Sequence, residues 1–190
     1  MAGLARQSGV GVEVATFEDW DLARREFDAV IAGQAWHWVD PVAGAAKAAQ
    51  ALRPAGRLAV FWNAFDPSPG LGKAFAEVYR QAMPGSPNVW AGPILDAYLK
   101  MCAKAADGFR QAGAFVGAEQ WRFGWDRRYT RGEWLDQVPT FGGQTQLPSA
   151  TLENLQAGIG AAVDAVGGSF TMRYTTVAVT AARPSALRVP

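Results

Sequence analysis

Residues 27–63 combine two short apolar runs with one helical segment, and this pattern narrows the choice of fold more than any other. The run FDAVIAG (27–33) is nearly all apolar and short, which is typical of a strand covered on both faces in a parallel sheet. The run RLAVFWN (57–63) has the same character. A strand, a short helix and a second strand form a βαβ unit with parallel strands and a right-handed crossover. The sequence therefore predicts an α/β fold.

The segment between these two runs carries signals for the start and the end of a helix. Asp40 can accept hydrogen bonds from the free amides of the first turn, and Pro41 suits the first helical position. Pro54 and Gly56 are expected to end the helix before the second strand begins. The apolar face of this helix is predicted to consist of Val42, Ala45, Ala49 and Leu52.

The rest of the chain alternates strand and helix patterns. GVEVAT (11–16) has β-branched residues between glycine and polar flanks, which predicts a short strand. The segment 119–130 alternates aromatic and polar residues, so we expect a strand with one exposed face. The segment 167–183 predicts a final strand with a buried end, and Ser149 or Thr151 is expected to cap the helix before it. Helices are expected at 71–83, 90–106, 131–138 and 149–166.

Composition limits the class of protein. A chain of 190 residues suits one domain, here 1–190 with a helical cap insertion at about 64–115. Its 18 basic and 17 acidic side chains are balanced, so nothing favours nucleic acid or a membrane surface as a partner. No apolar run is long enough to span a membrane, and the first residues lack the apolar core of a signal peptide. We expect a cytoplasmic protein.

The chain has too few cysteine and histidine residues for an internal disulfide or a typical zinc site. The single cysteine, Cys102, excludes an internal disulfide, and with only one histidine, His37, a closed zinc site would need carboxylates. We therefore expect no structural metal. A phosphate-binding turn is also not predicted, because the glycines of SGVGVEV (8–14) follow no strand and precede no helix.

Three predicted strand ends are candidates for a ligand site. In open α/β sheets, ligands bind beyond the carboxyl ends of the strands. This rule indicates Thr16–Trp20, Gly33–Asp40 and Asn63–Asp66. The acidic residues of the first segment can accept hydrogen bonds from an amino group or a ribose hydroxyl, or they can simply be solvated.

His37 and the tryptophans each have two interpretations. His37 lies between Trp36 and Trp38 and can act as a general base near neutral pH, or it can be a packing residue beside rings that cap the sheet. The other tryptophans can line an apolar substrate cavity or form the core. These are the tryptophans at 62, 90, 121, 125 and 134.

The order of four segments resembles the class I S-adenosylmethionine-dependent methyltransferases, in the group called methyltransferase type 11. In that family an acidic loop follows the third strand, the fourth strand begins with Phe-Asp, and a Leu-x-Pro-Gly-Gly turn precedes the fifth. Here these features correspond to VEVATFEDWDL, FDAVIAGQAWHWVDP and AAQALRPAGRLAVFWN, with Ala55 in place of the first glycine. FTMRYTTVAVTAAR is similar to the family's last strand, which inserts antiparallel beside the fifth. The resemblance implies a Rossmann-like, mostly parallel sheet with an antiparallel last strand.

The resemblance also implies site residues. Thr16, Phe17 and Glu18 correspond to the positions that contact the adenine of S-adenosylmethionine, and Thr16 replaces a residue that is often Asp. Gly33 and Gln34 correspond to the site that faces the methionine portion of the cofactor. The substrate side is implied to contain Trp36, Trp38 and Asn63, with His37 as a candidate catalytic base.

The family's first strand, glycine-rich loop and the acidic residue after strand two have no counterpart before residue 11. The sequence is therefore interpreted as an N-terminally truncated domain that lacks the first strands. Without the glycine loop, cofactor binding is expected to be impaired. The strand at 27–33 would then have an exposed edge, and self-association through that edge is expected.

Two functions remain open from the sequence. The first is S-adenosylmethionine-dependent methyl transfer to a small-molecule acceptor. The second is a non-catalytic remnant that binds a small apolar ligand or a partner chain through its aromatic cap.

Overall fold

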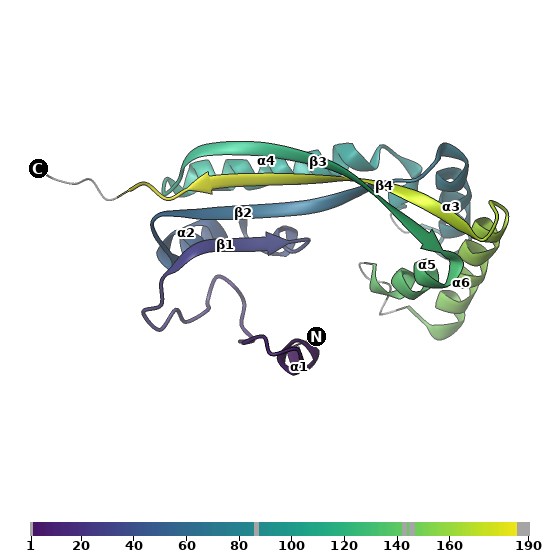
Figure 1. The fold of residues 1–190 in the computed structure, drawn as a ribbon, viewed down its shortest axis with the longest axis horizontal. Helices are drawn as coiled ribbons and strands as arrows, with labels where there is room; N and C mark the ends of the chain where they lie inside the picture. The colour runs from purple at the N-terminus through teal and green to yellow at the C-terminus, as the bar shows by residue number, and fades with distance from the viewer. Residues whose placement is uncertain (1, 86–87, 142–143, 145–146, 186–190) are drawn as a thin grey trace, which may run out of the picture. The chain divides into compact units, whose positions relative to one another are not determined.

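The structure is a computed structural model that describes residues 2–85, 88–141, 144 and 147–185. Within these residues the strands form one sheet in the order β1-β2-β4-β3. β1, β2 and β3 run in one direction and β4 runs in the opposite direction (Figure 1). The prediction of an α/β sheet with an antiparallel last strand is confirmed. The strand bounds are Phe27–Gly33 for β1, Leu52–Asp66 for β2, Val116–Thr130 for β3 and Ser169–Ala182 for β4.

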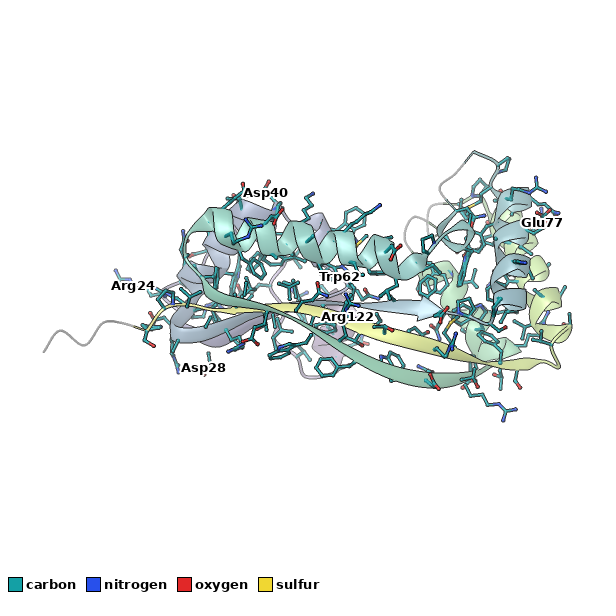
Figure 2. The ribbon with its side chains drawn as sticks, turned by 90° about the horizontal axis from the view of Figure 1, so that it is seen from above. Arg24, Asp28, Asp40, Trp62, Glu77 and Arg122 are labelled. Atoms are coloured by element: carbon teal, nitrogen blue, oxygen red, sulfur yellow. The ribbon has the colours of Figure 1, made fainter. Side chains whose placement is uncertain are left out.

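The predicted βαβ unit is present at the start of the sheet. β1 pairs in parallel with β2, and the register places Ala29 opposite Arg57 and Gly33 opposite Phe61. The connecting helix α2, Pro41–Ala51, begins as predicted (Figure 2): one Asp40 carboxylate oxygen accepts hydrogen bonds from the backbone N–H groups of Val42 and Ala43 at 3.0 and 2.8 Å.

The expectation that both strands are covered on two faces is wrong. No β1 residue is buried, and Ile31 is 67% exposed. β1 is the terminal strand of the sheet, and in the part of the chain that the structure describes it pairs with β2 alone. In β2 alternate residues are buried, including Leu58, Val60 and Trp62, so one face of that strand packs against the core. An apolar run fixes which residues can be buried, but the neighbouring elements decide whether they are.

The boundary between α2 and β2 lies earlier than predicted. The helix ends at Ala51, and β2 begins at Leu52 rather than at residue 57. The final strand draws this turn into the sheet, since Ala55 N–H donates to Arg183 O at 3.1 Å and Arg183 N–H donates to Gly56 O at 2.8 Å. Ala55 has φ +65°, a left-handed conformation that costs a residue with a Cβ about 1 to 2 kcal/mol. This conformation explains why glycine suits that position.

The segment 11–16 is not a strand, contrary to prediction. It follows the short helix α1, Ala2–Gln7, and has no neighbouring strand among the described residues. An isolated extended segment leaves its backbone groups unpaired, so β-branched residues alone do not make it a strand. Glu13 is instead held by Arg25, at the other end of the following loop, where Arg25 donates to both Glu13 carboxylate oxygens at 2.5 and 3.0 Å.

The chain divides into two compact units. The first unit comprises Met1–Phe61, Met101–Trp121 and Ala178–Pro190, and the second comprises Trp62–Lys100 and Arg122–Val177. In the first unit α2 is covered by the C-terminal part of α4, Ile94–Ala112. A Cβ on Gly108 would lie 2.3 Å from Pro41 O, so α4 approaches the first turn of α2 as closely as a glycine permits.

The second unit has a core of aromatic rings between helices. α3 (Pro69–Ala82) packs against α6 (Ser149–Asp164), and α5 (Arg131–Gln137) packs against α6. Trp134 is 1% exposed and contacts five other rings in this core. Short 3-10 turns, η2 and η3, lie at Val89–Ala91 and Val138–Thr140.

The helices predicted beyond residue 64 are all present, but one predicted cap is wrong. Neither Ser149 nor Thr151 caps α6. The helix begins at Ser149, its N-cap residue is Pro148, and no side chain caps it. The backbone oxygen of Pro148 accepts from Thr151 N–H. α5 has a capping box that was not predicted. Thr130 and Glu133 each accept from the other's backbone N–H.

The core interpretation holds for three of these five tryptophans, whereas the two on β3 are exposed and do not line the cavity at the end of β2. Trp62, Trp90 and Trp134 are buried, whereas Trp121 and Trp125 on β3 are 41% and 40% exposed. The predicted burial of Val177, Ala178 and Val179 in β4 is confirmed.

Candidate functional site

The exit of β1 has an unusual backbone. A Cβ on Gly33 would lie 2.6 Å from the Phe61 ring, so this position accommodates only glycine without a shift. The next residue, Gln34, has φ +55° and donates its backbone N–H to Phe61 O at 2.9 Å. A left-handed residue that is not glycine is strained, and such residues concentrate at functional sites. The strain marks the end of β1 as a candidate site.

The three residues that follow this exit have different environments. Trp36 is 4% exposed, and its ring contacts Phe17 at 5.8 Å and Phe109 at 6.1 Å between centroids. Trp36 is therefore a packing residue that joins the exit to two other segments. Trp38 is 80% exposed and His37 is also exposed, so their rings are available at the surface of this turn.

The loop at 16–19 is docked on the same turn. Glu18 Oε1 accepts the backbone N–H of Asp40 at 2.8 Å, and Phe17 contacts Trp36. This hydrogen bond joins Glu18 to Asp40, which is 22 positions later in the sequence and immediately precedes α2. The first two predicted segments, Thr16–Trp20 and Gly33–Asp40, do lie together in the first unit.

Thr16 has a carboxylate beside it. Thr16 Oγ1 donates to Asp19 Oδ2 at 2.8 Å, and both residues are exposed. A ligand amine at this position would meet the Asp19 carboxylate as well as the threonine hydroxyl. Asp19 was one of several loop acids in the sequence, and only the turn at 17–19 shows which of them reaches Thr16.

A polar cluster fixes the two ends of this loop. Glu13 accepts from Arg25 and from the Trp20 indole N–H, and the Arg25 guanidinium lies 5.0 Å from the centroid of the Trp20 ring. These hydrogen bonds, with that from Arg25 the largest cause, lower the pKa of Glu13 to about 2. Glu13 therefore stays ionised throughout the neutral range, and its bonds to Arg25 and Trp20 hold the loop that contains Phe17 and Glu18.

His37 is poised as a neutral base. Although His37 is exposed at the surface, its neighbours partly desolvate the imidazole, and this lowers its pKa below the ordinary value because desolvation disfavours the imidazolium form. Its ring lies 5.0 Å from that of Trp38. At neutral pH the imidazole is therefore mostly uncharged, which is the form that can accept a proton.

Asn63 belongs to the second unit. Its Oδ1 accepts from the Thr176 hydroxyl at 2.7 Å, and Thr176 Oγ1 accepts from the Trp125 indole N–H at 2.9 Å. These bonds link the side chain of Asn63 to β4 and β3. The predicted substrate-binding role of Asn63 stays a prediction.

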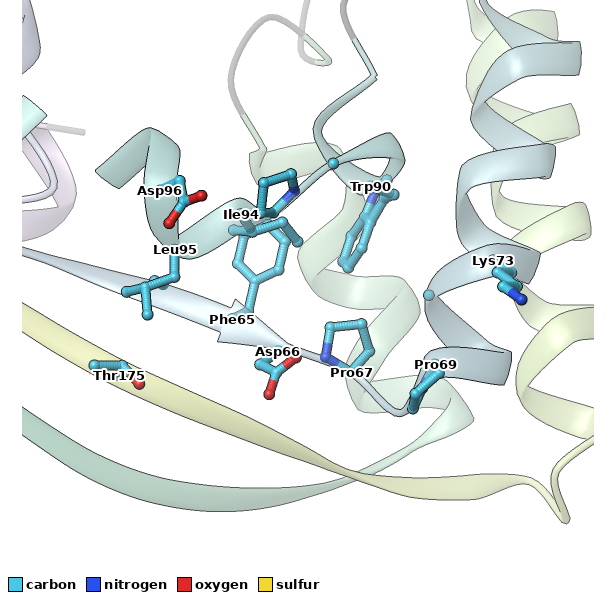
Figure 3. Close-up of a pocket in the computed structure, with 14 residues that line it drawn as sticks. Phe65, Asp66, Pro67, Pro69, Lys73, Trp90, Ile94, Leu95, Asp96 and Thr175 are labelled. Carbon is cyan, nitrogen blue, oxygen red and sulfur yellow. The ribbon is translucent and has the colours of Figure 1, made fainter. Parts of the chain in front are cut away.

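The end of β2 opens on a cavity in the second unit (Figure 3). Its volume is about 570 Å³, which lies within the range of small-molecule sites. The walls are mainly apolar and include Phe65, Trp90 and Ile94 (Figure 3), with the Phe65 and Trp90 ring centroids 4.6 Å apart. The charged lining residues are Asp66, Lys73 and Asp96. The third predicted segment, Asn63–Asp66, thus leads into a built cavity.

Neither a metal centre nor a membrane span is found in the described part of the chain. No group of three or more potential metal-ligating side chains occurs among those residues. None of the described helices is both long and apolar enough to cross a bilayer.

Part of the chain matches a known protein family in sequence. Residues 1–60 match the family model described as a methyltransferase domain. Proteins of Mycobacterium bovis and of two strains of Mycobacterium tuberculosis, each described as an uncharacterized methyltransferase, are 41% identical to this chain over 63 residues. The alignment covers 33% of this chain and 26% of each relative, so only about a quarter of those proteins is matched.

A solved structure extends the likeness to most of the fold. The chain resembles the structure of a putative type II methyltransferase from Anaeromyxobacter dehalogenans with a TM-score of 0.54 and 16% identity. The superposition covers 92% of this chain and 72% of that protein. At this identity the likeness concerns the fold alone, and it extends well beyond the segment matched in sequence.

Proposed function

We propose that this chain is a class I S-adenosylmethionine-dependent methyltransferase and takes part in methyl transfer to a small-molecule acceptor, which the methyltransferase-domain match over residues 1–60 and the shared fold support. The observation that carries the proposal is the docking of the 16–19 loop on the exit of β1 through Glu18 and Asp40. This contact gathers the exposed groups of two segments around one strand end, where α/β sheets bind ligands.

The residues at this exit fit the parts of the cofactor. The Asp19 carboxylate and the Thr16 hydroxyl can hold the exocyclic amine of an adenine, and Phe17 offers an apolar ring beside them. The methionine portion would meet the strand end at Gly33 and Gln34, where the Phe61 ring packs against the glycine. The exposed rings of His37 and Trp38 lie three and four positions after Gln34 along the turn.

The chemistry requires little beyond positioning. When bound, S-adenosylmethionine supplies an electrophilic methyl group, which an acceptor atom attacks in line. The chain's contribution is to hold the reactants and exclude water, and ordered positioning accounts for a large share of such rate increases. Trp38 can cover the reacting centre, and His37, being neutral, can take the acceptor's proton at an imidazole nitrogen.

We propose that the affinity of this chain for the cofactor is low. Residues 2–15, as the structure describes them, contain no glycine-rich turn between a strand and a helix, so these residues offer no backbone cradle of that kind for the amino acid end. If the ribose of the cofactor also lacks two hydrogen bonds to an acidic residue, each worth about 1.5 to 3 kcal/mol, binding is weakened roughly a hundredfold or more.

Replacing Asp19 with asparagine is expected to weaken S-adenosylmethionine binding about tenfold, because the adenine amine loses a charged acceptor. Isothermal titration calorimetry with the chain as it stands measures the dissociation constant. The matched control is Asp21→Asn, since the Asp21 carboxylate accepts from Ala23 N–H within the same loop and asparagine can keep that bond. Equal affinities for wild type, Asp19→Asn and Asp21→Asn would contradict the assigned adenine site.

His37→Gln is expected to leave binding unchanged and to reduce only turnover.

A second function is favoured by the cavity at the end of β2. Its volume of about 570 Å³ and its walls of Phe65, Trp90 and Ile94 suit a small apolar ligand. Binding there needs no cofactor, so the cavity supports a non-catalytic role for the second unit.

Indole is a suitable probe for the cavity, and it is expected to shift the side-chain N–H resonance of Trp90 in a two-dimensional NMR spectrum. Ile94→Trp fills part of the cavity and should abolish the shift. Val166→Trp, at an exposed site in the same unit that does not line the cavity, should retain it. An unperturbed Trp90 signal at millimolar indole would remove this second function.

A further inference from the structure

β3 is an edge strand with an unusual surface. It is the last strand in the sheet order, and one of its edges has no neighbour in the part of the chain that the structure describes. All its residues except Tyr129 are exposed, and Phe123 and Trp125 are 55% and 40% exposed. A long edge with exposed aromatic side chains is a ready template for pairing with another strand.

The register with β4 shows which backbone groups of β3 point outward. Arg131 N–H donates to Gly168 O at 2.9 Å. Trp125 lies opposite Tyr174 and Tyr129 lies opposite Phe170 in that same register, with ring centroids 4.1 and 5.9 Å apart. The strand is therefore regular between residues 125 and 131.

Backbone groups along a regular strand alternate between its two edges. The odd-numbered residues between 125 and 131 direct their N–H and C=O groups toward β4, and those of Asp126 point to the open edge. β3 is one unbroken strand over Val116–Thr130, so we extend the same alternation to Arg122 and Gly124, whose backbone groups then also point to the open edge.

The sequence around Gly124 is complementary to itself. In RFGWD (122–126) a cation and an anion lie two residues to either side of the glycine, and an aromatic residue lies next to it on each side. If a second copy of the strand runs antiparallel with Gly124 opposite Gly124, Arg122 faces Asp126 and Phe123 faces Trp125. A two-fold axis makes each of these pairs occur twice.

We propose that two copies of this chain dimerise by antiparallel pairing of β3 with β3 about a two-fold axis at Gly124. Gly124 has no side chain, so the two backbones meet there without obstruction, and its outward N–H and C=O bond to the same groups of the partner. Opposite charges and aromatic pairs directly across the strands both stabilise such pairing. This interface is distinct from the β1 edge, for which self-association was predicted from the sequence.

A charge reversal tests the pairing. Sedimentation velocity on the full chain is expected to show a monomer–dimer equilibrium. Asp126→Arg places Arg opposite Arg122 at both ends of the contact, so the dissociation constant should rise at least tenfold. The double exchange Arg122→Asp with Asp126→Arg restores both opposite-charge pairs and should return the constant to within about threefold of wild type. Asp136→Arg makes the same change of charge on α5 and should have no effect.

A backbone variant provides a second test that does not depend on charge. Gly124→Pro removes the outward N–H at the two-fold axis and should abolish the dimer, while the circular dichroism spectrum stays that of wild type. A wild-type chain that stays monomeric at about 100 μM, or a dimer that Asp126→Arg and Gly124→Pro leave unchanged, would overturn the proposal.

Discussion

Gly108→Ala is expected to destabilise the protein by about 2 kcal/mol or more, although alanine is the better helix former by about 1 kcal/mol. The added methyl group would lie 2.3 Å from the carbonyl oxygen of Pro41 and 2.6 Å from its carbonyl carbon. Both are backbone atoms of the first turn of α2, and they cannot rotate away. The helix α4 must therefore move outward.

The displacement would reach the candidate site. Phe109, next to Gly108, is 1% exposed and packs against Trp36, which in turn supports Phe17. The control is Gly70→Ala in α3, where a Cβ meets nothing within 4 Å and where alanine should be neutral or slightly stabilising. Urea unfolding followed by circular dichroism measures both variants. Equal midpoints for the two would contradict the close contact between α4 and α2.

Trp134→Ala is expected to cost about 3 to 5 kcal/mol, the range for removing a large aromatic side chain from a core. Trp134 is 1% exposed, and its ring is stacked 5.9 Å from Phe75 and lies 5.1 and 5.3 Å from Tyr129 and Phe170. Few of these neighbours can move into the vacated volume, because they also contact one another.

Trp134→Phe distinguishes the contribution of ring packing to stability from that of the indole N–H group. The Trp134 Nε1 is buried and has no hydrogen-bond partner in the described residues, so phenylalanine removes an unpaired donor together with part of the ring. We expect Trp134→Phe to cost at least about 2 kcal/mol less than Trp134→Ala. Equilibrium unfolding in urea compares the two. A phenylalanine variant as unstable as the alanine variant would show that Nε1 has a partner after all.

Local chemistry accounts for the part of the fold that could be predicted. The Asp40 cap and Pro41 specify the start of α2 through groups only two or three residues away, and β1 was located to the residue. The capping box of Thr130 and Glu133 was equally local but was not recognised. The run at 11–16 shows the limit, since a strand also needs a neighbour that no local pattern specifies.

Long-range contacts account for what could not be predicted at the site. Glu18 reaches the N–H of Asp40, and Phe109 packs on Trp36 from 73 positions away in the chain. Residue types alone left Trp36 and Trp38 equivalent, whereas burial now separates a packing residue from an exposed ring. The resemblance located the turn, and the structure distinguished the roles of its residues.

The central claim is that the docked loop and the exit of β1 form one nucleoside-binding surface. Titrating the isotope-labelled chain with S-adenosylhomocysteine and following its backbone amide NMR signals tests this claim most directly. Saturable shifts gathered at residues 16–19 and 33–40 are the predicted result. Unchanged signals in both segments at millimolar ligand, or shifts confined to the cavity lined by Phe65 and Trp90, would contradict it.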